Sequence, residues 1–370
     1  MVETSDAEGS QWVAAELANR NLRHKRRTIV IASSSVAAGR LVSAIRERGA
    51  EGIGVAQIGG AGNARFGSYA DVLVMSFAHA HHNFLANLSV YRHILPTIDT
   101  LVICDADDVD GTARHHLGHI LRRLIHAFSE FAVTPQIVLT AAPLANPATF
   151  SLALTGCALA HVRLPRTLPR SVLHLGTAIE AHHANELREC SRILASLIGA
   201  GQTVALLTSS REQVEHIFMN ARTRMSPEFV DRLQPLRGGY LSDVRDVRRA
   251  ELAYNPTSSV VTTIASASQF ELTRFDFVLI YGFPASLGEL RRTLRQCETV
   301  SSHSPAVIIM LRGRPIDQWI SNDPLFLSQV HRPHLATLIA GERFATSHLT
   351  AAASIAPLRF DIDSPWWEPV

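Results

Sequence analysis

The sequence has 370 residues, enough for two domains, and its content of 46% hydrophobic and 18% charged residues excludes a disordered or fibrous protein. No apolar run reaches the roughly 20 residues that cross a bilayer, and the acidic start MVETSDAEGS differs from a secretory signal, so we expect a cytoplasmic protein without a membrane partner. The net charge of +2 gives no overall field that indicates nucleic acid, and the four cysteines contain no C-x-x-C pair, which excludes a zinc ribbon and a disulfide framework.

The first half of the chain alternates helix and strand patterns. Predicted helices cover residues 10–22, 36–49 and 113–132, and predicted apolar strands cover 28–33, 70–77, 100–105 and 135–143. In the third helix Leu117, Leu121 and Leu124 lie on one helical stripe. Because strands alternate with helices, the pattern predicts a doubly wound parallel sheet over 28–165, after a polar N-terminal segment of residues 1–27.

The second half repeats this organisation. Residues 166–184, with Pro169 near their start, predict a linker. A predicted helix then covers 185–199, and predicted strands cover 203–209, 258–265, 275–284 and 305–313. We therefore expect a second α/β domain over 185–313 and a C-terminal tail over 314–370.

An acidic group follows the third predicted strand. In TLVICDADDVDG, residues 100–111, the apolar run is typical of a strand buried on both faces, and Asp105, Asp107 and Asp108 come directly after it. Open α/β sheets bind ligands at this edge, so a Mg²⁺ or nucleotide-phosphate site is one interpretation. The alternative is a polar turn that only ends the strand.

Six motifs together carry a resemblance to a known family. In chain order they are TLVICDADD, PQIVLTAAPLANPATF, LLTSSREQVE, LRGGYLSDVR, LIYGFPASL and GRPIDQWISNDP. Their order and spacing, from about residue 28 to about 358, resemble superfamily 2 DNA helicases of the DEAD/DEAH-box type, and the branch of bacterial DNA-repair helicases with a C-terminal cysteine-rich domain. The sequence ends before any such domain. The resemblance implies two tandem RecA-like domains, the helicase core.

The acidic box departs from the family pattern. In the helicases that it resembles, the first Asp helps to hold Mg²⁺ and the Glu positions the attacking water. Asp105 keeps the first position, but Ala106 stands in place of the Glu, and Asp107 and Asp108 stand in place of Ala and His. Since a methyl group accepts no proton, the box is a degenerate one with no intact catalytic residue.

Other nucleotide-handling positions are changed as well. A Walker loop requires lysine, and the only lysine of the chain, Lys25, lies elsewhere. Residues 6–17 are a relic of that loop and its helix, and the strand that should precede them is expected to be missing, so that the first domain is N-terminally truncated. The family's Ser-Ala-Thr becomes Ala141-Ala142-Pro143, its G-I-D becomes Gln269-Phe270-Glu271, and its two arginine-finger positions hold Gln296 and Thr299. We expect no bound cofactor.

Three groups of residues are candidates for nucleic-acid contact. Ser33, Ser34 and Ser35 match the place where the family contacts the DNA backbone, although three serines could also simply end a strand. Arg237 lies in a well-matching motif. A basic helical face, which could also be an ordinary solvated face, is formed by Arg291, Arg292 and Arg295.

Histidines form two groups, His79, His81 and His82 in one and His115, His116 and His119 in the other. His115 and His119 lie one helical turn apart, a spacing that could serve a metal ion. The sequence nominates no third ligand, so the prediction is that no metal is bound.

The favoured function is a pseudohelicase with no enzymatic activity of its own. We expect it to bind single-stranded DNA or another nucleic acid weakly, or a protein partner, in DNA handling or regulation. One alternative is an ATP-dependent DNA helicase subunit that a partner chain completes. The other is a scaffold that binds only proteins.

Overall fold

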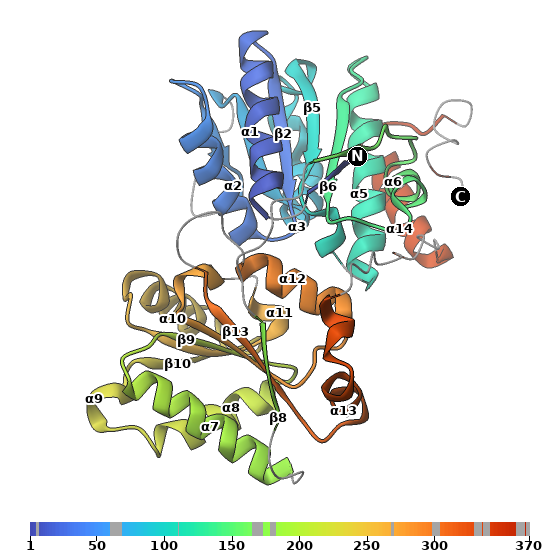
Figure 1. The fold of residues 1–370 in the computed structure, drawn as a ribbon. Helices are drawn as coiled ribbons and strands as arrows, with labels where there is room; N and C mark the ends of the chain where they lie inside the picture. Colours follow the sequence, from blue (N-terminus) through green and yellow to red (C-terminus); the bar gives the residue numbers. More distant parts are fainter. Residues whose placement is uncertain are drawn as a thin grey trace. The chain divides into compact units, whose positions relative to one another are not determined.

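The computed structural model describes residues 1–4, 7–59, 69–109, 111–164, 173–177, 183–267, 270–297, 304–328, 335, 341–359 and 367. The chain divides into two compact units (Figure 1). The first contains Met1–Thr167 and Arg332–Val370, and the second contains Leu168–His331. Each unit holds one sheet in which all paired strands are parallel, so the predicted α/β class is confirmed.

The sheet of the first unit has seven strands in the order β3-β4-β2-β5-β6-β1-β7. The strands are β1 (Val2–Glu3), β2 (Arg27–Ala32), β3 (Val55–Gln57), β4 (Val72–Ser76), β5 (Ile98–Ile103), β6 (Gln136–Ala141) and β7 (Val162–Arg163). The expectation that the strand before the loop relic is missing is wrong, because Val2 and Glu3 pair in parallel with both β6 and β7. Two residues are too few to show a strand pattern in the sequence.

Helices cover both faces of this sheet. The α-helices are α1 (Ala7–Arg23), α2 (Ser35–Arg48), α3 (Phe77–His79), α4 (Leu88–Tyr91), α5 (Gly111–Ser129), α6 (Pro147–Thr155) and α14 (Glu342–Ala353). Short helical turns are η2 (Ala80–Phe84), η3 (Leu85–Asn87), η4 (Leu95–Thr97) and η5 (Ala106–Asp108). Successive strand side chains alternate between faces. Val30 therefore packs in the cluster of α1 and α2, and Ile31 packs in the cluster of α5 (Figure 1).

The region predicted as a C-terminal tail contributes to the first unit, since α14 packs against α5.

The sheet of the second unit has six strands in the order β10-β11-β9-β12-β13-β8. The strands are β8 (Leu173–Thr177), β9 (Val204–Thr208), β10 (Leu233–Leu236), β11 (Ser259–Thr263), β12 (Phe277–Tyr281) and β13 (Ala306–Leu311). β8 lies within the stretch predicted as a linker and pairs with β13. Its sequence, LHLGT, is short and closely follows two prolines, which favoured a linker over a strand.

Helices also cover both faces of the second sheet (Figure 1). They are α7 (His183–Gly199), α8 (Arg211–Arg222), α9 (Pro227–Val230), α10 (Ser242–Tyr254), α11 (Ile264–Ala267), α12 (Leu287–Cys297) and α13 (Pro315–Asn322), with turns η6 (Leu272–Arg274) and η7 (Pro324–Ser328). Leu206 packs among residues of α7 and α8, whereas Leu207 packs among residues of α10, α12 and α13. Among the described residues, no helix has the length and apolar character needed to span a bilayer.

Candidate functional site

Three chain segments meet at the carboxyl edge of the first sheet. β5, β6 and β1 are neighbours and run parallel, so the residues that follow them lie at the same edge. The acidic box follows β5, Ala142 and Pro143 follow β6, and Thr4 leads from β1 toward α1. This edge is where open α/β sheets bind their ligands.

Asp105 is held by a ring of hydrogen bonds. The Ser10 hydroxyl donates to Oδ1 of Asp105 at 2.7 Å, and the backbone N–H of Asp105 donates to Oγ1 of Thr140 at 3.0 Å. The Thr140 hydroxyl closes the ring by donating to Ser10 Oγ at 2.9 Å. Asp105 has a left-handed backbone, with φ 50° and ψ 53°, a conformation that Asp adopts more readily than most residues. The family resemblance assigns Mg²⁺ binding to the Asp105 carboxylate. Here that carboxylate accepts a hydrogen bond from the Ser10 hydroxyl in α1.

Ser10 lies in the segment that the sequence analysis related to the Walker loop. In a P-loop the strand is followed by a loop ending in Gly-Lys-[Ser/Thr] at the start of a helix, and here Gly9, Ser10 and Gln11 lie in the first turns of α1 after β1. Ser10 is completely buried. Its side chain is a short, uncharged hydroxyl, so it offers no charge to a phosphate. The sequence analysis did not identify Ser10, although a glycine before a small polar residue was the signal that could have found it.

The remaining box residues face the protein. Ala106 is fully buried and packs in the cluster formed by the sheet and α5. Asp107 is 7% exposed, and its Oδ1 accepts the backbone N–H of Ala142 at 3.0 Å. The Asp107 carboxylate thus joins the box to the end of β6, in the segment that replaces the family's Ser-Ala-Thr.

Glu3 is a second buried carboxylate, and its contacts hold β1 in place. The sequence analysis did not identify it. Glu3 accepts the backbone N–H of Leu144 at 3.2 Å through Oε1 and the Arg163 Nε–H at 2.7 Å through Oε2, while His161 Nε2 lies 3.3 Å from Oε1. Burial raises the pKa of Glu3, but the bonds from Leu144 and Arg163 outweigh burial and hold the pKa below its usual value. A charged Glu3 therefore ties β1 to β7 and to the segment after β6.

Ser33 and Ser34 lie between β2 and α2, and Ser35 is the first residue of α2. Ser34 is the N-cap of α2, and its Oγ accepts the backbone N–H of Ala37 at 3.1 Å. Ser33 is partly exposed, and Ser35 is exposed. The structure therefore gives Ser34 a capping role, and it leaves the role of Ser33 and Ser35 in nucleic-acid contact as a prediction.

Replacing Ser34 by Ala should lower the free energy of unfolding by about 0.5–2 kcal/mol, because the first turn of α2 loses the acceptor for an N–H group. Urea denaturation followed by circular dichroism measures the change. Ser33→Ala is the matched control, and we expect it to shift the free energy by less than about 0.5 kcal/mol. Equal losses in both variants would contradict the capping role.

Arg237 lies in an ion-pair network between β10 and α10. Its Nε donates to Oε1 of Glu215 at 2.6 Å, and the Tyr240 hydroxyl donates to the same oxygen at 2.6 Å. The guanidinium groups of Arg237 and Arg248 each lie 4.5 Å from the centre of the Tyr240 ring. Burial raises the pKa of Glu215, but the hydrogen bonds from Tyr240 and Arg237 outweigh it and lower the pKa. Arg237 therefore has a structural partner in Glu215.

The arginines of α12 differ in exposure. Arg295 is only 9% exposed, while Arg291 and Arg292 are partly exposed. Burial lowers the pKa of Arg291. The helical period places Arg295 on the same side of α12 as Arg291 and Arg292, as predicted, but Arg295 is buried, so two of the three arginines remain partly exposed.

Several predicted positions belong to the second unit and are only partly described. Phe270 is buried and Glu271 is exposed, while Gln269 lies outside the described residues. Gln296 is partly buried, and Thr299 lies outside the described residues.

Comparison with known proteins shows that the chain is similar to part of two helicases. No family model matches the chain. Two curated proteins named ATP-dependent helicase, hrq1 of Schizosaccharomyces pombe and HRQ1 of Saccharomyces cerevisiae, are 20% and 23% identical to it over 301 and 309 residues. Each match covers 78% of this chain but 28% of the relative, so the chain spans little more than a quarter of their length.

Solved helicase structures share the fold. The DUF1998 helicase MrfA bound to DNA and AMPPNP superposes with a TM-score of 0.78 at 19% identity, over 97% of this chain and 52% of that protein. The Mycobacterium smegmatis helicase Lhr bound to ssDNA and AMP-PNP gives a TM-score of 0.73 at 16% identity, over 99% and 51%. The two parallel sheets are therefore tandem RecA-like helicase domains, and the comparisons support the resemblance to superfamily 2 helicases.

Proposed function

We propose that this chain is a helicase-like protein that has kept the RecA-like core for binding nucleic acid and has lost ATP chemistry. The observation that carries the proposal is the closed hydrogen-bond ring of Ser10, Asp105 and Thr140 beside the buried Ala106. The carboxylate at the Mg²⁺ position is engaged with α1, and the segment related to the Walker loop and the position of the glutamate base hold Ser10 and Ala106. At this edge of the sheet, the polar groups thus bond to one another and serve the structure.

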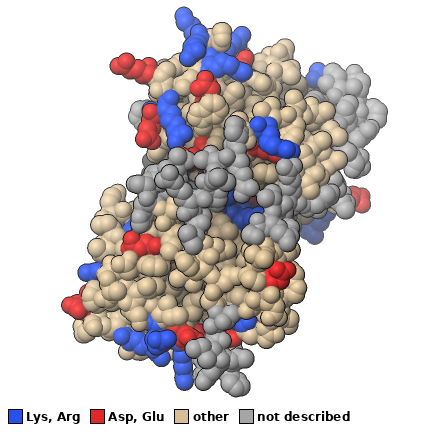
Figure 2. Space-filling view, in the orientation of Figure 1, with Lys and Arg blue, Asp and Glu red and all other residues tan. Residues whose placement is uncertain are grey.

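Nucleic acid is the favoured ligand because the family resemblance implies contacts to backbone phosphates, which require hydroxyls and arginines and no nucleotide. Solved neighbours of the same fold are described as bound to DNA or to ssDNA. Ser33 and Ser35 in the first unit, and Arg291 and Arg292 in the second, are the groups that we propose for these contacts. The face of each unit in Figure 2 shows cationic and anionic side chains in small, separate groups, which favours weak and sequence-independent binding.

We expect the protein to bind a fluorescein-labelled single-stranded oligonucleotide at about 50 mM salt with a dissociation constant of about 10⁻⁵ M or lower, because non-specific binding of about 10⁻⁴–10⁻⁶ M at physiological salt becomes tighter at lower salt. The affinity should fall as salt rises, because each phosphate contact releases counterions. Fluorescence anisotropy measures both quantities.

The double variant Arg291→Gln/Arg292→Gln should weaken this binding and reduce the salt slope by up to about 0.7 for each phosphate interaction that the substitutions remove. Arg295 is kept, since replacing a buried side chain would confuse binding with folding. Arg188→Gln/Arg192→Gln on α7 is the matched control, because it removes the same charge from two exposed positions of the same unit. Equal effects of both double variants, or no binding at tens of micromolar protein, would favour the protein-scaffold alternative.

The alternative of a helicase subunit completed by a partner chain makes a different prediction. ATP hydrolysis should then appear only after a host extract is added, and it should disappear in Asp105→Ala.

A further inference from the structure

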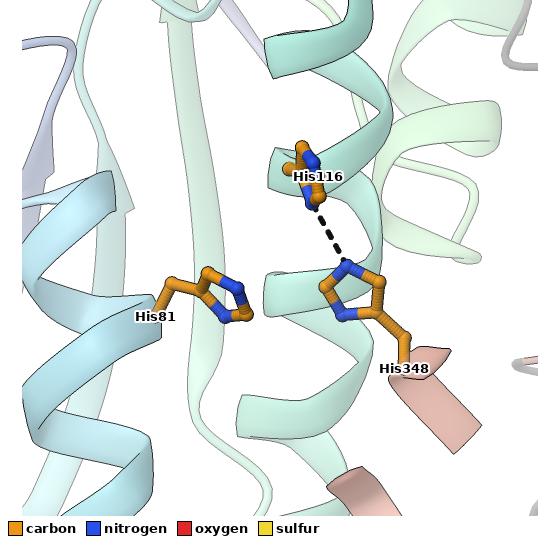
Figure 3. A group of neighbouring side chains, drawn as sticks. All are labelled: His81, His116 and His348. Carbon is orange, nitrogen blue, oxygen red and sulfur yellow. Dashed lines mark hydrogen bonds between the residues drawn. The ribbon is translucent and has the colours of Figure 1, made fainter. Parts of the chain in front are cut away.

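Three histidines from separate parts of the sequence meet within the first unit. His81 lies in η2, His116 in α5 and His348 in α14, and Figure 3 shows their rings turned toward one another. One ring nitrogen of each lies within 4.8 Å of those of the other two. The Nδ1 of His116 and the Nε2 of His348 are 3.0 Å apart and form a hydrogen bond.

We propose that His81, His116 and His348 are the protein ligands of a transition-metal dication of the zinc class. Imidazole nitrogen is a preferred ligand of such ions, and three protein ligands with water in the fourth position are a common zinc arrangement. This set of ligands differs from the pair of His115 and His119 that the helical spacing suggested. The third ligand comes from α14, more than 200 residues further along the chain.

The distances require only a small rearrangement. Two nitrogens bound to one tetrahedral zinc ion lie about 3.3 Å apart, since each Zn–N bond is about 2.0–2.1 Å. The nitrogens of His116 and His348 are already closer than this, at 3.0 Å. A rotation of the partly exposed His81 side chain on η2 would therefore be the main movement.

The surroundings leave polar nitrogen atoms without partners. The Nδ1 atoms of His348 and of the neighbouring His119 are buried and have no hydrogen-bond partner within the described part of the chain. The His119 and His348 rings stack with centroids 4.8 Å apart. The metal would bind Nε2 of His348, which lies 3.0 Å from Nδ1 of His116, so the unpaired Nδ1 atoms are neighbours of the site and not its ligands.

The histidines are in the form that binds metal. Burial, with the charges of neighbouring histidines and Arg123 as smaller contributions, lowers the pKa of His81 to about 4 and that of His348 to about 3. Burial also lowers the pKa of His116. A lowered pKa favours the neutral imidazole, which binds a metal ion without releasing a proton.

Arg123, which lies next to His81, opposes the binding of a metal ion. Arg123 is 4% exposed, and its Nη1 donates to Nδ1 of His81 at 3.1 Å. A neutral imidazole has one nitrogen lone pair, so His81 must give up this bond to bind a metal ion. The guanidinium charge also repels the cation. Arg123 therefore limits the affinity, and removing it should make binding tighter.

The test is isothermal titration of untagged full-length protein with ZnCl₂, and titration with CoCl₂ followed by visible absorption. We expect one Zn²⁺ per chain, Co²⁺ bands of a tetrahedral site, and a higher melting temperature with Zn²⁺, since an ion that binds only the folded state stabilises it.

His116→Gln and His81→Gln change partly exposed residues. Each should lower the affinity for Zn²⁺ by at least about 100-fold, which is more than the loss of a group that only orients a ligand typically costs. Arg123→Met should tighten it by about 10-fold or more, the value of a hydrogen bond to a charged group.

His115→Gln on the same helix is the matched control and should leave the affinity unchanged. The proposal is overturned if no Zn²⁺ binds at about 100 μM, or if the His116→Gln and His115→Gln variants lose affinity equally.

Discussion

Purified protein mixed with ATP, Mg²⁺ and single-stranded DNA should release phosphate at less than about one-thousandth of the rate of an active helicase, because several catalytic groups are missing at once. Removal of one electrostatic donor typically costs about 10²–10³-fold, and an arginine finger is worth about 10³–10⁵-fold. The position of the glutamate base holds the buried Ala106, and the segment related to the Walker loop holds the buried Ser10. Release of radiolabelled phosphate, measured over hours, checks the rate.

Asp105→Ala is the control for contaminating ATPases. Residual hydrolysis that persists unchanged in this variant comes from another protein. Hydrolysis that is lost in Asp105→Ala and depends on DNA would overturn the proposed loss of ATP chemistry. The same variant should still bind the oligonucleotide, because Asp105 contacts Ser10 and Thr140 and lies apart in sequence from the proposed phosphate contacts.

Glu3→Ala should lower the free energy of unfolding of the first unit by about 1–3 kcal/mol, since it leaves the buried N–H of Leu144 without its acceptor. This is less than the about 3–5 kcal/mol expected for a broken buried pair, because the Arg163 side chain is 54% exposed and can be solvated. Thermal denaturation at pH 7 should show a melting temperature lower by roughly 2–10 °C.

The effect of Glu3 should depend on pH. Its pKa is lowered in the folded protein, so its contribution to stability is complete above the unfolded pKa of about 4.3 and is lost as the pH falls toward the folded value. Glu3→Gln keeps an acceptor for Leu144 and removes the charge. The difference in unfolding free energy between wild type and Glu3→Gln should therefore be constant at neutral pH and shrink as the pH falls below about 4.3 and through the lowered folded pKa. A difference that stays constant over this range would contradict the charged role of Glu3.

Strong periodic patterns allowed most of the fold to be predicted from the sequence. Strands such as Val204–Thr208 and Phe277–Tyr281 are buried on both faces, and this burial requires continuous apolar runs that are visible without a structure. Five strands, β1, β3, β7, β8 and β10, were missed because each has only two to five residues, too few for a clear pattern, and depends on neighbouring strands for its pairing. Val2 gains its partners only when β6 and β7 lie on either side of it.

For the candidate site as well, the sequence predicted some features and not others. The acidic box and the substitution of Ala106 follow from a local motif at the end of a strand. The bond between Ser10 and Asp105 joins residues 95 positions apart, and no local pattern predicts it. Arg295 was assigned to an exposed face because the charge of a residue gives no information about its burial, and Arg295 is 9% exposed.

By itself, the sequence determined the α/β class, the presence of two sheets and the residue types in the acidic box, because residue identities and hydrophobic periods are local properties of the chain. Only the tertiary structure decided which polar groups are partners. Long-range packing brought Ser10 to Asp105, Glu3 to Arg163, and His348 to His81 and His116. Such contacts depend on the positions of elements that are distant in the sequence, and they form only when burial of the apolar faces places those elements side by side.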